Sequence, residues 1–597
     1  MANSDIVDFN RVFDIVSYQE IRFPQQKALN EFKKGKWENL GIKSARKKID
    51  TISFWLIEKG FVKGDKVAFV PRTGNPIWML LDFACQQLGL IIVPIHPTYS
   101  SEELGFILSE TEARLCLVAD LDLYNTVENV INKENLDPLL FHLEAGLKGC
   151  FSDSLSGNTN QFYDQLVKNK EAISQTDTLA IMYTSGTSGV PKGVILTHHN
   201  VVSNIKSILP ILPLKPMDRV LSFLPFSHIL ERTTCYAYIA VGAEIYFNRH
   251  VDNLASDFQT VKPYFCTAVP RTMEKTVDFL HQQRLKRNKV TSALIKWSMG
   301  VAEKYKDPSK TGFFFGFKLF WARTLVLNIW RKKLGGKIRY IGVGAAALDP
   351  KISRLFSAAG VMTLAGYGLT EASPFVTVNR PDTRMNNHGT VGPAIPGVDI
   401  EIESPDEDGN GEILVRGPNV MTGYFKRPEL TSEVLKDGWL RTGDIGRFTN
   451  KHFLVITDRK KDIFKTSSGK YIAPQPLENL LVSSPFITQS LIIGFNRSFV
   501  TALVVPNFSL LKSWCEEKGI HWTSPQFMIH NIKIVEKIQI EVGDFNENLE
   551  SHKKIRNFTL LEEEWTTEGK YLTVSLKLIR DRIEKRFQKE IEGMYHH

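Results

Sequence analysis

The sequence has few cysteines, and none of them is spaced as a disulfide framework or a zinc site requires. No C-x-x-C pair occurs in the 597 residues, and the six cysteines are dispersed as Cys85, Cys116, Cys150, Cys235, Cys266 and Cys515. Stable disulfides belong to oxidising compartments, whereas scattered single cysteines are typical of a reducing one. We therefore expect six free thiols and no structural metal site built on sulfur.

The chain also lacks a hydrophobic run long enough to cross a membrane. Its most apolar stretch, residues 77–94, is interrupted by Asp82, Gln86 and Gln87 and ends at Pro94. This pattern predicts a buried helix followed by a strand. The first residues, MANSDIVDFNRVFD, are acidic and lack the basic and then apolar segments of a secretory signal. We therefore expect a cytoplasmic protein.

Acidic residues are outnumbered by basic ones, 65 against 74, which gives a formal net charge of +9. Such an excess favours anionic partners such as nucleotides, CoA or acidic lipid surfaces. No recognition-helix, zinc-finger or RNP-like pattern accompanies the charge, so we expect no nucleic-acid partner. The chain length exceeds what a single hydrophobic core supports, and 43% apolar residues suffice for two or more domains.

Apolar strand-like runs alternate with helical patterns up to about residue 380, which predicts an α/β domain with largely parallel sheets. Strands punctuated by glycine and proline then indicate a small β-rich subdomain. Beyond it, short strands mix with charged helices. We predict a large N-terminal domain over 1–458 and a smaller, mobile α+β domain over 459–597, joined at the sequence DRKKD.

One stretch between Arg271 and Arg339 is unusually rich in aromatic and aliphatic residues and ends in basic ones. Two interpretations stay open. The stretch forms core helices that pack on the large domain, or it forms a wall of a lipid tunnel or a surface that contacts membranes.

The loop from Tyr183 to Gly193, YTSGTSGVPKG, combines the groups that bind a phosphate chain. Its glycines permit close approach of the backbone, and its hydroxyls and one cation can bind phosphate oxygens. The residues concerned are Thr184, Ser185, Gly186, Thr187, Ser188, Gly189 and Lys192. A Walker A loop has a different spacing, because here the lysine follows a proline. Composition alone also fits a flexible surface loop, but the apolar segments on both sides favour a phosphate cradle.

These eleven residues resemble the signature of the adenylate-forming superfamily, which includes acyl-CoA synthetases and luciferases. Further motifs follow in the family's order over nearly the whole chain. VGAAALDP resembles the adenine loop, in which the small residues Gly344, Ala345 and Ala346 admit a flat purine. In GYGLTE, Tyr367 and Gly368 would meet adenine, Thr370 would bind the α-phosphate, and Glu371 together with Thr184 would hold Mg²⁺.

The resemblance assigns four more residues to nucleotide and CoA binding. Asp444 in WLRTGDIG and Arg459 in DRKKD match the positions that bind ribose, and Lys461 matches the hinge. Lys465, with Ser467 to Lys470, would approach CoA. Each motif taken alone also fits an ordinary turn or a solvated charged face.

The lysine that assists adenylation has two candidates. LTVSLKLIR is similar to the C-terminal pattern of long-chain members and selects Lys577, with Val574 in place of a proline. The general pattern T-x-x-G-K would instead select Lys570. LPFSHILERT resembles another long-chain pattern and puts His228 where members line the acyl site, although a lone histidine is more often a structural hydrogen-bonding group.

Together these motifs imply a long-chain fatty acid–CoA ligase that uses ATP, Mg²⁺ and CoA. Because the sequence has no membrane span and such a substrate partitions into lipid, we expect peripheral association with anionic membranes through basic and aromatic surface. The catalytic residues would be Thr184, Lys192, His228, Glu371 and Lys577. Two alternatives remain: a fatty acyl-AMP ligase that delivers to a carrier protein, and a non-catalytic protein that binds lipid or nucleotide.

Overall fold

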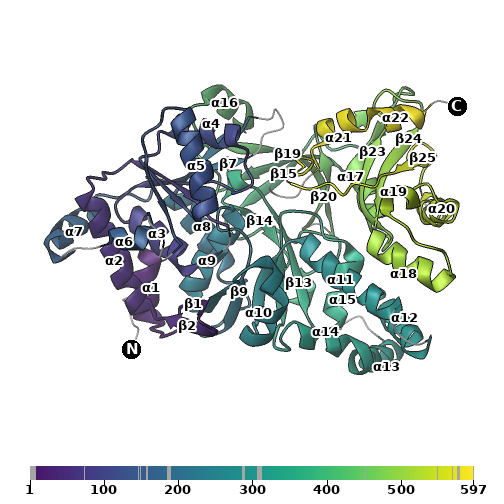
Figure 1. The fold of residues 1–597 in the computed structure, drawn as a ribbon, viewed down its shortest axis with the longest axis horizontal. Coiled ribbons are helices and arrows are strands. Elements are labelled where there is room, and N and C mark those ends of the chain that lie inside the picture. The colour runs from purple at the N-terminus through teal and green to yellow at the C-terminus, as the bar shows by residue number, and fades with distance from the viewer. Residues whose placement is uncertain are drawn as a thin grey trace.

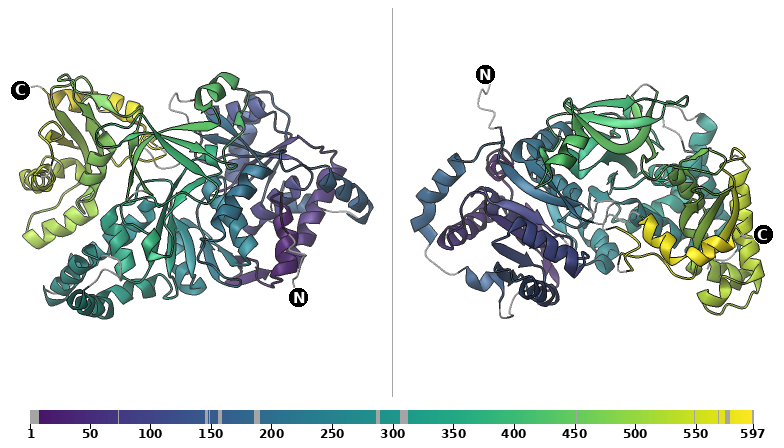
Figure 2. Two further views of the ribbon diagram at one scale, coloured as in Figure 1. Left: turned by 180° about the vertical axis from the view of Figure 1, so that it is seen from behind. Right: turned by 90° about the horizontal axis from the view of Figure 1, so that it is seen from above.

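The structure is a computed structural model that describes residues 8–72, 74–144, 147, 149–155, 159–184, 190–285, 289–305, 312–450, 452–547, 549–567, 569–573 and 578–595. Figure 1 shows a large N-terminal part joined through β19 and β20 to a smaller C-terminal part. The three views agree that the C-terminal part lies at one end of the long axis (Figure 2).

The first sheet has seven strands in the order β17-β8-β7-β4-β3-β5-β6. Its central strands β7, β4, β3, β5 and β6 run parallel, whereas β8 pairs antiparallel with β7 on one side and with β17 on the other. Central parallel strands are buried on both faces, which explains why their sequences read as continuous apolar runs. The bounds are β3 Lys66–Val70, β4 Ile91–Pro94, β5 Leu115–Val118, β6 Leu139–His142, β7 Thr178–Thr184, β8 Lys192–Thr197 and β17 Gly423–Tyr424.

The second sheet has eight strands in the order β14-β13-β12-β11-β9-β10-β1-β2. All neighbouring pairs are parallel except the two at the edges, β13 with β14 and β1 with β2. The bounds are β1 Leu29–Lys33, β2 Lys36–Leu40, β9 Arg219–Ser222, β10 Glu244–Phe247, β11 Phe265–Ala268, β12 Tyr340–Val343, β13 Met362–Gly368 and β14 Phe375–Val378.

Helices connect these parallel strands and bury the core. The described ones are α1 Asp14–Arg22, α2 Ile42–Glu58, α3 Pro76–Gln86, α4 Ser101–Thr111, α5 Leu121–Lys133, α6 Phe151–Ser154, α7 Tyr163–Glu171, α8 His198–Ile208, α9 Ile229–Val241, α10 Leu254–Val261, α11 Pro270–Leu285, α12 Lys289–Glu303, α13 Phe313–Ala322, α14 Asn328–Lys333, α15 Pro350–Ala358 and α16 Pro428–Val434. A π-helical turn, η4 (Arg323–Leu327), joins α13 to α14. Nearly every residue of α9 is buried, so this helix belongs to the core itself.

The fully buried helix α9 carries an ion pair into the core. Arg232 donates to both carboxylate oxygens of Asp82 on α3, with Nη2 to Oδ1 at 2.5 Å, and Tyr236 also donates to that carboxylate. A buried charge is tolerated only when it is paired and hydrogen-bonded. The cluster therefore fixes how α9 docks on α3.

A third, antiparallel sheet leads to the C-terminal part. Its order is β15-β16-β19-β18, and β20 pairs with β19. The bounds are β15 Asp399–Glu403, β16 Gly411–Arg416, β18 Leu435–Lys436, β19 Trp439–Thr449 and β20 Phe453–Arg459. The sequence predicts this small β-rich subdomain, because its strand-like runs are separated by glycine and proline.

The C-terminal part has its own core around a three-stranded sheet, β23-β24-β25, with a short hairpin of β21 and β22 before it. Its strands are β21 Phe464–Lys465, β22 Tyr471–Ile472, β23 Ile487–Ile493, β24 Val500–Pro506 and β25 Ile555–Leu560. Its helices are α17 Pro474–Val482, α18 Phe508–Lys518, α19 Pro525–Met528, α20 Ile532–Asn546, α21 Arg580–Arg586 and α22 Gln588–Gly593.

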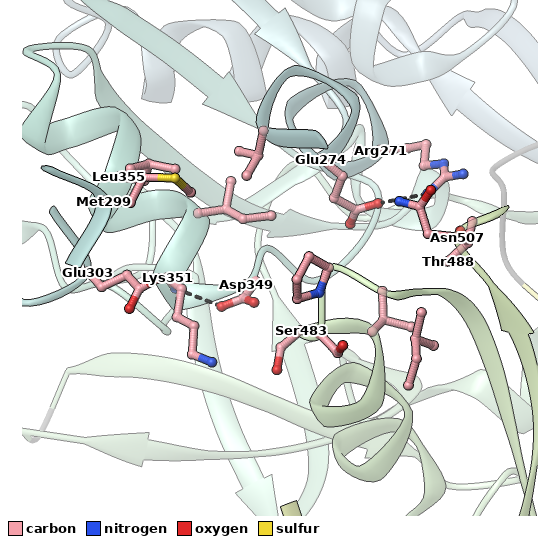
Figure 3. A pocket seen from close by; sticks show the side chains of 16 residues that line it. Arg271, Glu274, Met299, Glu303, Asp349, Lys351, Leu355, Ser483, Thr488 and Asn507 are labelled. Atoms are coloured by element: carbon pink, nitrogen blue, oxygen red, sulfur yellow. Dashed lines mark hydrogen bonds and ion pairs between the residues drawn. The ribbon is translucent and has the colours of Figure 1, made fainter. Parts of the chain in front are cut away.

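A cleft of about 90 Å³ separates α11, α12 and α15 from the segment that joins α17 to β23 (Figure 3). Glu274 and Asp349 face this cleft, and burial raises the pKa of both carboxyl groups. Near it, Arg271 on α11 forms an ion pair with Glu564 at 2.9 Å. Because Glu564 is 56% exposed, the pair holds the two parts together only weakly.

Several expectations from the sequence are confirmed. The fold is α/β with mixed sheets, and residues 77–94 form most of α3 and then β4. All six cysteines are free and buried. Among the described residues, no helix is both long enough and apolar enough to cross a membrane.

Candidate functional site

The predicted site residues follow the carboxyl ends of parallel strands from both large sheets. β7 ends at Thr184, β12 is followed by Gly344, and β13 by Thr370 and Glu371. Ligands of open α/β sheets bind beyond these ends, because the loops there are free to shape a site. The topology therefore gathers segments that are nearly 190 residues apart in sequence.

The two ends of the phosphate-cradle loop are fixed by the ladder of β7 and β8. Thr184 pairs directly with Lys192, and Tyr183 pairs with Gly193. The Tyr183 hydroxyl also donates to Glu110 Oε2 at 2.6 Å, which anchors the entry to the loop on α4. The predicted phosphate ligands Ser185, Gly186, Thr187, Ser188 and Gly189 lie outside the described residues.

Tyr424 on β17 joins two of the predicted site residues. Its hydroxyl donates to Glu371 Oε1 at 2.9 Å, and the Lys192 ammonium lies 5.5 Å from the centre of its ring. Burial, reinforced by the charge of Glu371, raises the pKa of Tyr424, so the phenol keeps its proton and acts as the donor. A cation, an aromatic ring and a carboxylate thus meet beside the loop.

The backbone around Glu371 is held by the segment that leads to β17. The amide of Met421 donates to the Glu371 carbonyl at 2.8 Å, and the Asn419 side chain donates to the Ala372 carbonyl at 2.9 Å. Glu371 itself lies in a single 3-10 turn, Thr370–Ala372. These bonds fix the backbone of this turn, and the Tyr424 hydroxyl then orients the Glu371 carboxylate.

A second linked group joins β13, β19 and β20. The Tyr367 hydroxyl donates to Asp444 Oδ2 at 2.7 Å, and Arg459 Nε lies 3.3 Å from Asp444 Oδ1. Asp444 and Arg459 are direct partners in the β19–β20 ladder. Burial and the charge of Asp444 raise the pKa of Tyr367, so this phenol is also a donor.

Neighbouring atoms lie close to two glycines in the predicted adenine region. A Cβ at Gly368 would lie 1.8 Å from the Pro374 carbonyl oxygen, so a larger residue cannot stand there without moving the backbone. A Cβ at Gly344 would lie 3.1 Å from a Leu230 methyl group. Ala345 adopts a left-handed φ of 69°, which turns the chain sharply after β12, and Ala346 is exposed beside it.

His228 has a structural role in the helix that follows it. Its Nδ1 accepts a hydrogen bond from the Leu230 amide at 3.2 Å and caps the N-terminus of α9. His96, which follows β4, was not identified from the sequence. Burial, with a smaller contribution from the charge of His228, lowers the pKa of His96 to about 4. His96 is therefore neutral near pH 7.

The predicted lysines of the C-terminal part occupy turns and a hairpin. Lys461 lies in the turn after β20, and Lys465 stacks on Tyr471, with its ammonium 4.5 Å from the ring centre. Lys570 stands in a turn with φ 60°, and its amide donates to the Thr567 carbonyl at 3.0 Å. The competing candidate, Lys577, lies outside the described residues.

Sequence reasoning identified neither Tyr424 nor His96. Tyr424 is 53 residues from Glu371 and more than 200 from Lys192, and no spacing rule connects them. Tyr424 comes close to Lys192 because β17, a strand of two residues, pairs with β8, which is far away in the sequence.

The chain matches two family models that together cover most of its length. The model described as AMP-binding enzyme matches residues 18–425, and the AMP-binding enzyme C-terminal domain matches residues 461–597.

Similar proteins span nearly the same length. A long-chain-fatty-acid–CoA ligase, FadD15, of Mycobacterium bovis is 29% identical over 94% of this chain and 93% of its own. Long-chain-fatty-acid–CoA ligase 1 of Homo sapiens is 28% identical over 94% of this chain and 82% of its own. Among solved structures, the adenylation domain of a carboxylate reductase from Mycobacterium chelonae superposes with a TM-score of 0.76 at 20% identity, covering 98% of this chain and 91% of that one.

Proposed function

The chain belongs to the AMP-binding enzyme family, and on that premise we propose that it is a long-chain fatty acid–CoA ligase. Relatives of that name match it over 94% of its length, and the motif order agrees. The reaction has two steps. A carboxylate oxygen of the fatty acid attacks the α-phosphorus of ATP and pyrophosphate leaves; the CoA thiolate then attacks the acyl carbon and AMP leaves.

Adenylation crowds negative charge at one place, because a carboxylate approaches a polyphosphate. In our proposal Lys192 offsets that charge at the phosphate chain, next to the hydroxyl of Thr184. Asp444 accepts hydrogen bonds from the ribose hydroxyls, Arg459 reaches the same sugar, and Tyr367 borders the adenine together with Gly344, Ala345, Ala346 and Gly368. Thr370 binds the α-phosphate. Lys577 approaches the reacting carboxylate and α-phosphate.

The described residues fit a magnesium ion that ATP brings with it. Among them, no cluster of three or more histidine, cysteine or acidic side chains could form a cage of protein ligands. Magnesium commonly binds through one or two protein oxygens and substrate phosphates, which Glu371 and Thr184 can supply. When bound, the ion neutralises charge on the phosphate oxygens. The hydrogen bond from Tyr424 aims the Glu371 carboxylate without adding a positive charge.

The two steps need different groups at one carbonyl. We therefore propose that a C-terminal domain over 459–597 turns about Lys461 against an N-terminal domain over 1–458, and that Lys465 then faces CoA. The weak Arg271–Glu564 pair across the two parts is consistent with such a movement. His228 takes part only by shaping the acyl site, since its Nδ1 already caps α9.

One observation carries the proposal most strongly. The segment of residues 367–371 links the Asp444–Arg459 pair, through Tyr367, to the Tyr424–Lys192 pair, through Glu371. The carboxylate that we propose for the ribose, Asp444, and the cation that we propose for the phosphates, Lys192, thereby lie on either side of one short stretch.

A panel of fatty acids with ATP, Mg²⁺ and CoA, scored for pyrophosphate and for thioester, tests the proposal. We expect both products with long-chain acids. Pyrophosphate without thioester would indicate a ligase that delivers to a carrier protein, and the absence of both would indicate a non-catalytic binding protein.

We also propose that the protein is cytoplasmic and associates peripherally with anionic membranes. The net charge of +9 favours such surfaces, and a long-chain fatty acid partitions into lipid.

A further inference from the structure

A row of large apolar side chains projects from α13 into solvent. We call it the aromatic ridge; it consists of Phe313, Phe314, Phe317, Phe320 and Trp321, whose exposed fractions run from 85% to 42%. Leu325 on η4 and Ile329 on α14 continue it at 42% and 54% exposed. Steps of one, three or four residues between them put these side chains along one side of the helical rod. Single exposed apolar residues are common on proteins, but a contiguous row marks an interaction site.

The opposite side of the same rod is packed into the protein. Leu319, Ala322, Leu327 and Trp330 are at most 7% exposed and belong to one buried apolar cluster that includes Met299 on α12 and Leu355 on α15. Arg323 further ties the rod to α15, because its Nε donates to the Ala358 carbonyl at 2.6 Å. The ridge therefore cannot turn inward without removing these residues from the core. Figure 1 shows α12, α13 and α14 at an outer edge of the molecule, away from β19 and β20.

The charged residues of the segment that carries the ridge have one sign. From Gly312 to Lys337 the sequence contains no acidic residue. Its exposed basic residues are Lys318, Lys332, Lys333 and Lys337. A second copy packed on this face about a two-fold axis would bring the same positive charges together. An anionic lipid surface instead complements them while it takes up the aromatic rings.

We propose that the aromatic ridge is the element by which this protein inserts into anionic membranes, with the flanking lysines on lipid headgroups. The inference rests on the proposed function, because a ligase that collects its substrate from a bilayer gains from docking there. Aromatic side chains suit the boundary between headgroups and acyl chains. In this proposal both interpretations of the stretch hold, with its inner side in the core and its outer side on the membrane surface.

Cosedimentation of the full chain with vesicles tests the proposal without ATP, CoA or fatty acid, so its outcome is independent of the ligase chemistry. The vesicles contain phosphatidylcholine alone or phosphatidylcholine with phosphatidylglycerol. We expect binding to the anionic vesicles at low salt and release at high salt. The double variant Phe317→Gln, Phe320→Gln should bind at least tenfold more weakly, and Lys332→Glu, Lys333→Glu should lose the preference for anionic lipid.

Phe527→Gln is the matched control, because Phe527 on α19 is 68% exposed but stands apart from the ridge. It should bind vesicles as the unaltered protein does. Circular dichroism and turnover of a short, water-soluble fatty acid check that each variant is folded. Equal vesicle binding by the ridge variant and the unaltered protein would overturn the proposal. So would light scattering that shows a dimer dispersed by the ridge variant while vesicle binding stays the same, because a second copy would then be the occupant.

Discussion

At the scale of single residues, Tyr424 is the side chain whose position says most about the site. It touches Glu371 through its hydroxyl and Lys192 through its ring, so it sets two of the groups that would meet magnesium ATP. Tyr424→Phe removes the hydroxyl and keeps the ring. A hydrogen bond to a charged group contributes about 1.5–3 kcal/mol, so we expect adenylation to slow by about tenfold to a hundredfold at limiting Mg²⁺. Pyrophosphate release measured against Mg²⁺ concentration checks this.

Tyr163→Phe is the matched control, because Tyr163 is 57% exposed on α7. The control should leave the Mg²⁺ dependence unchanged. Raising Mg²⁺ should restore part of the activity of Tyr424→Phe, since only the aim of the carboxylate is disturbed. A normal Mg²⁺ dependence for Tyr424→Phe would contradict the positioning role.

A buried acid gives the fold a distinctive pH dependence. Burial raises the pKa of Glu231 from 4.5 to about 8, while the Ser222 hydroxyl donates to its Oε1 at 2.5 Å. The folded pKa lies above the unfolded one, so the contribution of Glu231 to stability is complete below pH 4.5. It is lost as pH rises towards 8, with a slope of up to about 1.4 kcal/mol per pH unit.

Glu231→Gln should remove that slope, because the amide keeps the acceptor for Ser222 and does not titrate. Denaturant unfolding of both proteins across this pH window measures the difference. Glu58→Gln, at an exposed position on α2, should keep the slope of the unaltered protein. Parallel stability curves for Glu231→Gln and the unaltered protein would refute the assignment.

At the scale of elements, the end of β13 is the most constrained turn of the site. A Cβ at Gly368 would lie 1.8 Å from the Pro374 carbonyl oxygen. Gly368→Ala must therefore displace the backbone between Tyr367 and Glu371, and we expect a loss of stability of about 2–4 kcal/mol and a larger loss of adenylation. Thermal unfolding and pyrophosphate release measure the two effects.

Gly300→Ala makes the same chemical change on α12, where the added methyl group meets no atom within 4 Å. Helix propensity predicts that this variant gains up to about 1 kcal/mol. Equal behaviour of the two alanine variants would show that the close approach at Gly368 is not a constraint.

The sequence predicts the elements better than the contacts between them. Short continuous apolar runs, which alternate with helical patterns along the chain, identify β3, β4, β5 and β7, because a buried parallel strand needs continuous apolar residues. The sequence also predicts that Tyr367 lies near Asp444 and Arg459, because all three stand in motifs that the family resemblance assigns to the nucleotide. Tyr424 could not be predicted this way, because β17 contributes only two residues to the first sheet and carries no periodic pattern.

The helices α12 to α14 show a second limit of sequence patterns. Their apolar content fits core helices as well as a lipid-contacting surface, and the structure buries only one side of the rod formed by α13, η4 and α14. A helix that is apolar on all sides can lie in a core or at a lipid surface, and composition does not distinguish the two. In the structure, Leu319 and Trp330 are packed in the core, whereas Phe313 and Phe317 are exposed.

At the scale of the whole molecule, the proposed turn of the C-terminal domain would bring different groups to one carbonyl in the two successive reactions. Lys577→Ala should slow formation of acyl-AMP about a hundredfold or more and change thioester formation from supplied acyl-AMP by less than about threefold. Half-reaction assays separate the two steps. Lys570→Ala is the control and should leave both steps nearly unchanged. If Lys570→Ala, and not Lys577→Ala, slows formation of acyl-AMP, then Lys570 is the lysine that assists adenylation.

A single-turnover experiment tests the coupling of the two steps most directly. Enzyme in excess over labelled hexadecanoic acid is mixed with ATP and Mg²⁺, and CoA is added afterwards. We expect the label to appear first in acyl-AMP, which stays bound and accumulates, and then to pass into acyl-CoA as AMP is released. Acyl-AMP that never forms, or that persists unchanged after CoA is added, would contradict the assignment of this chain as a fatty acid–CoA ligase.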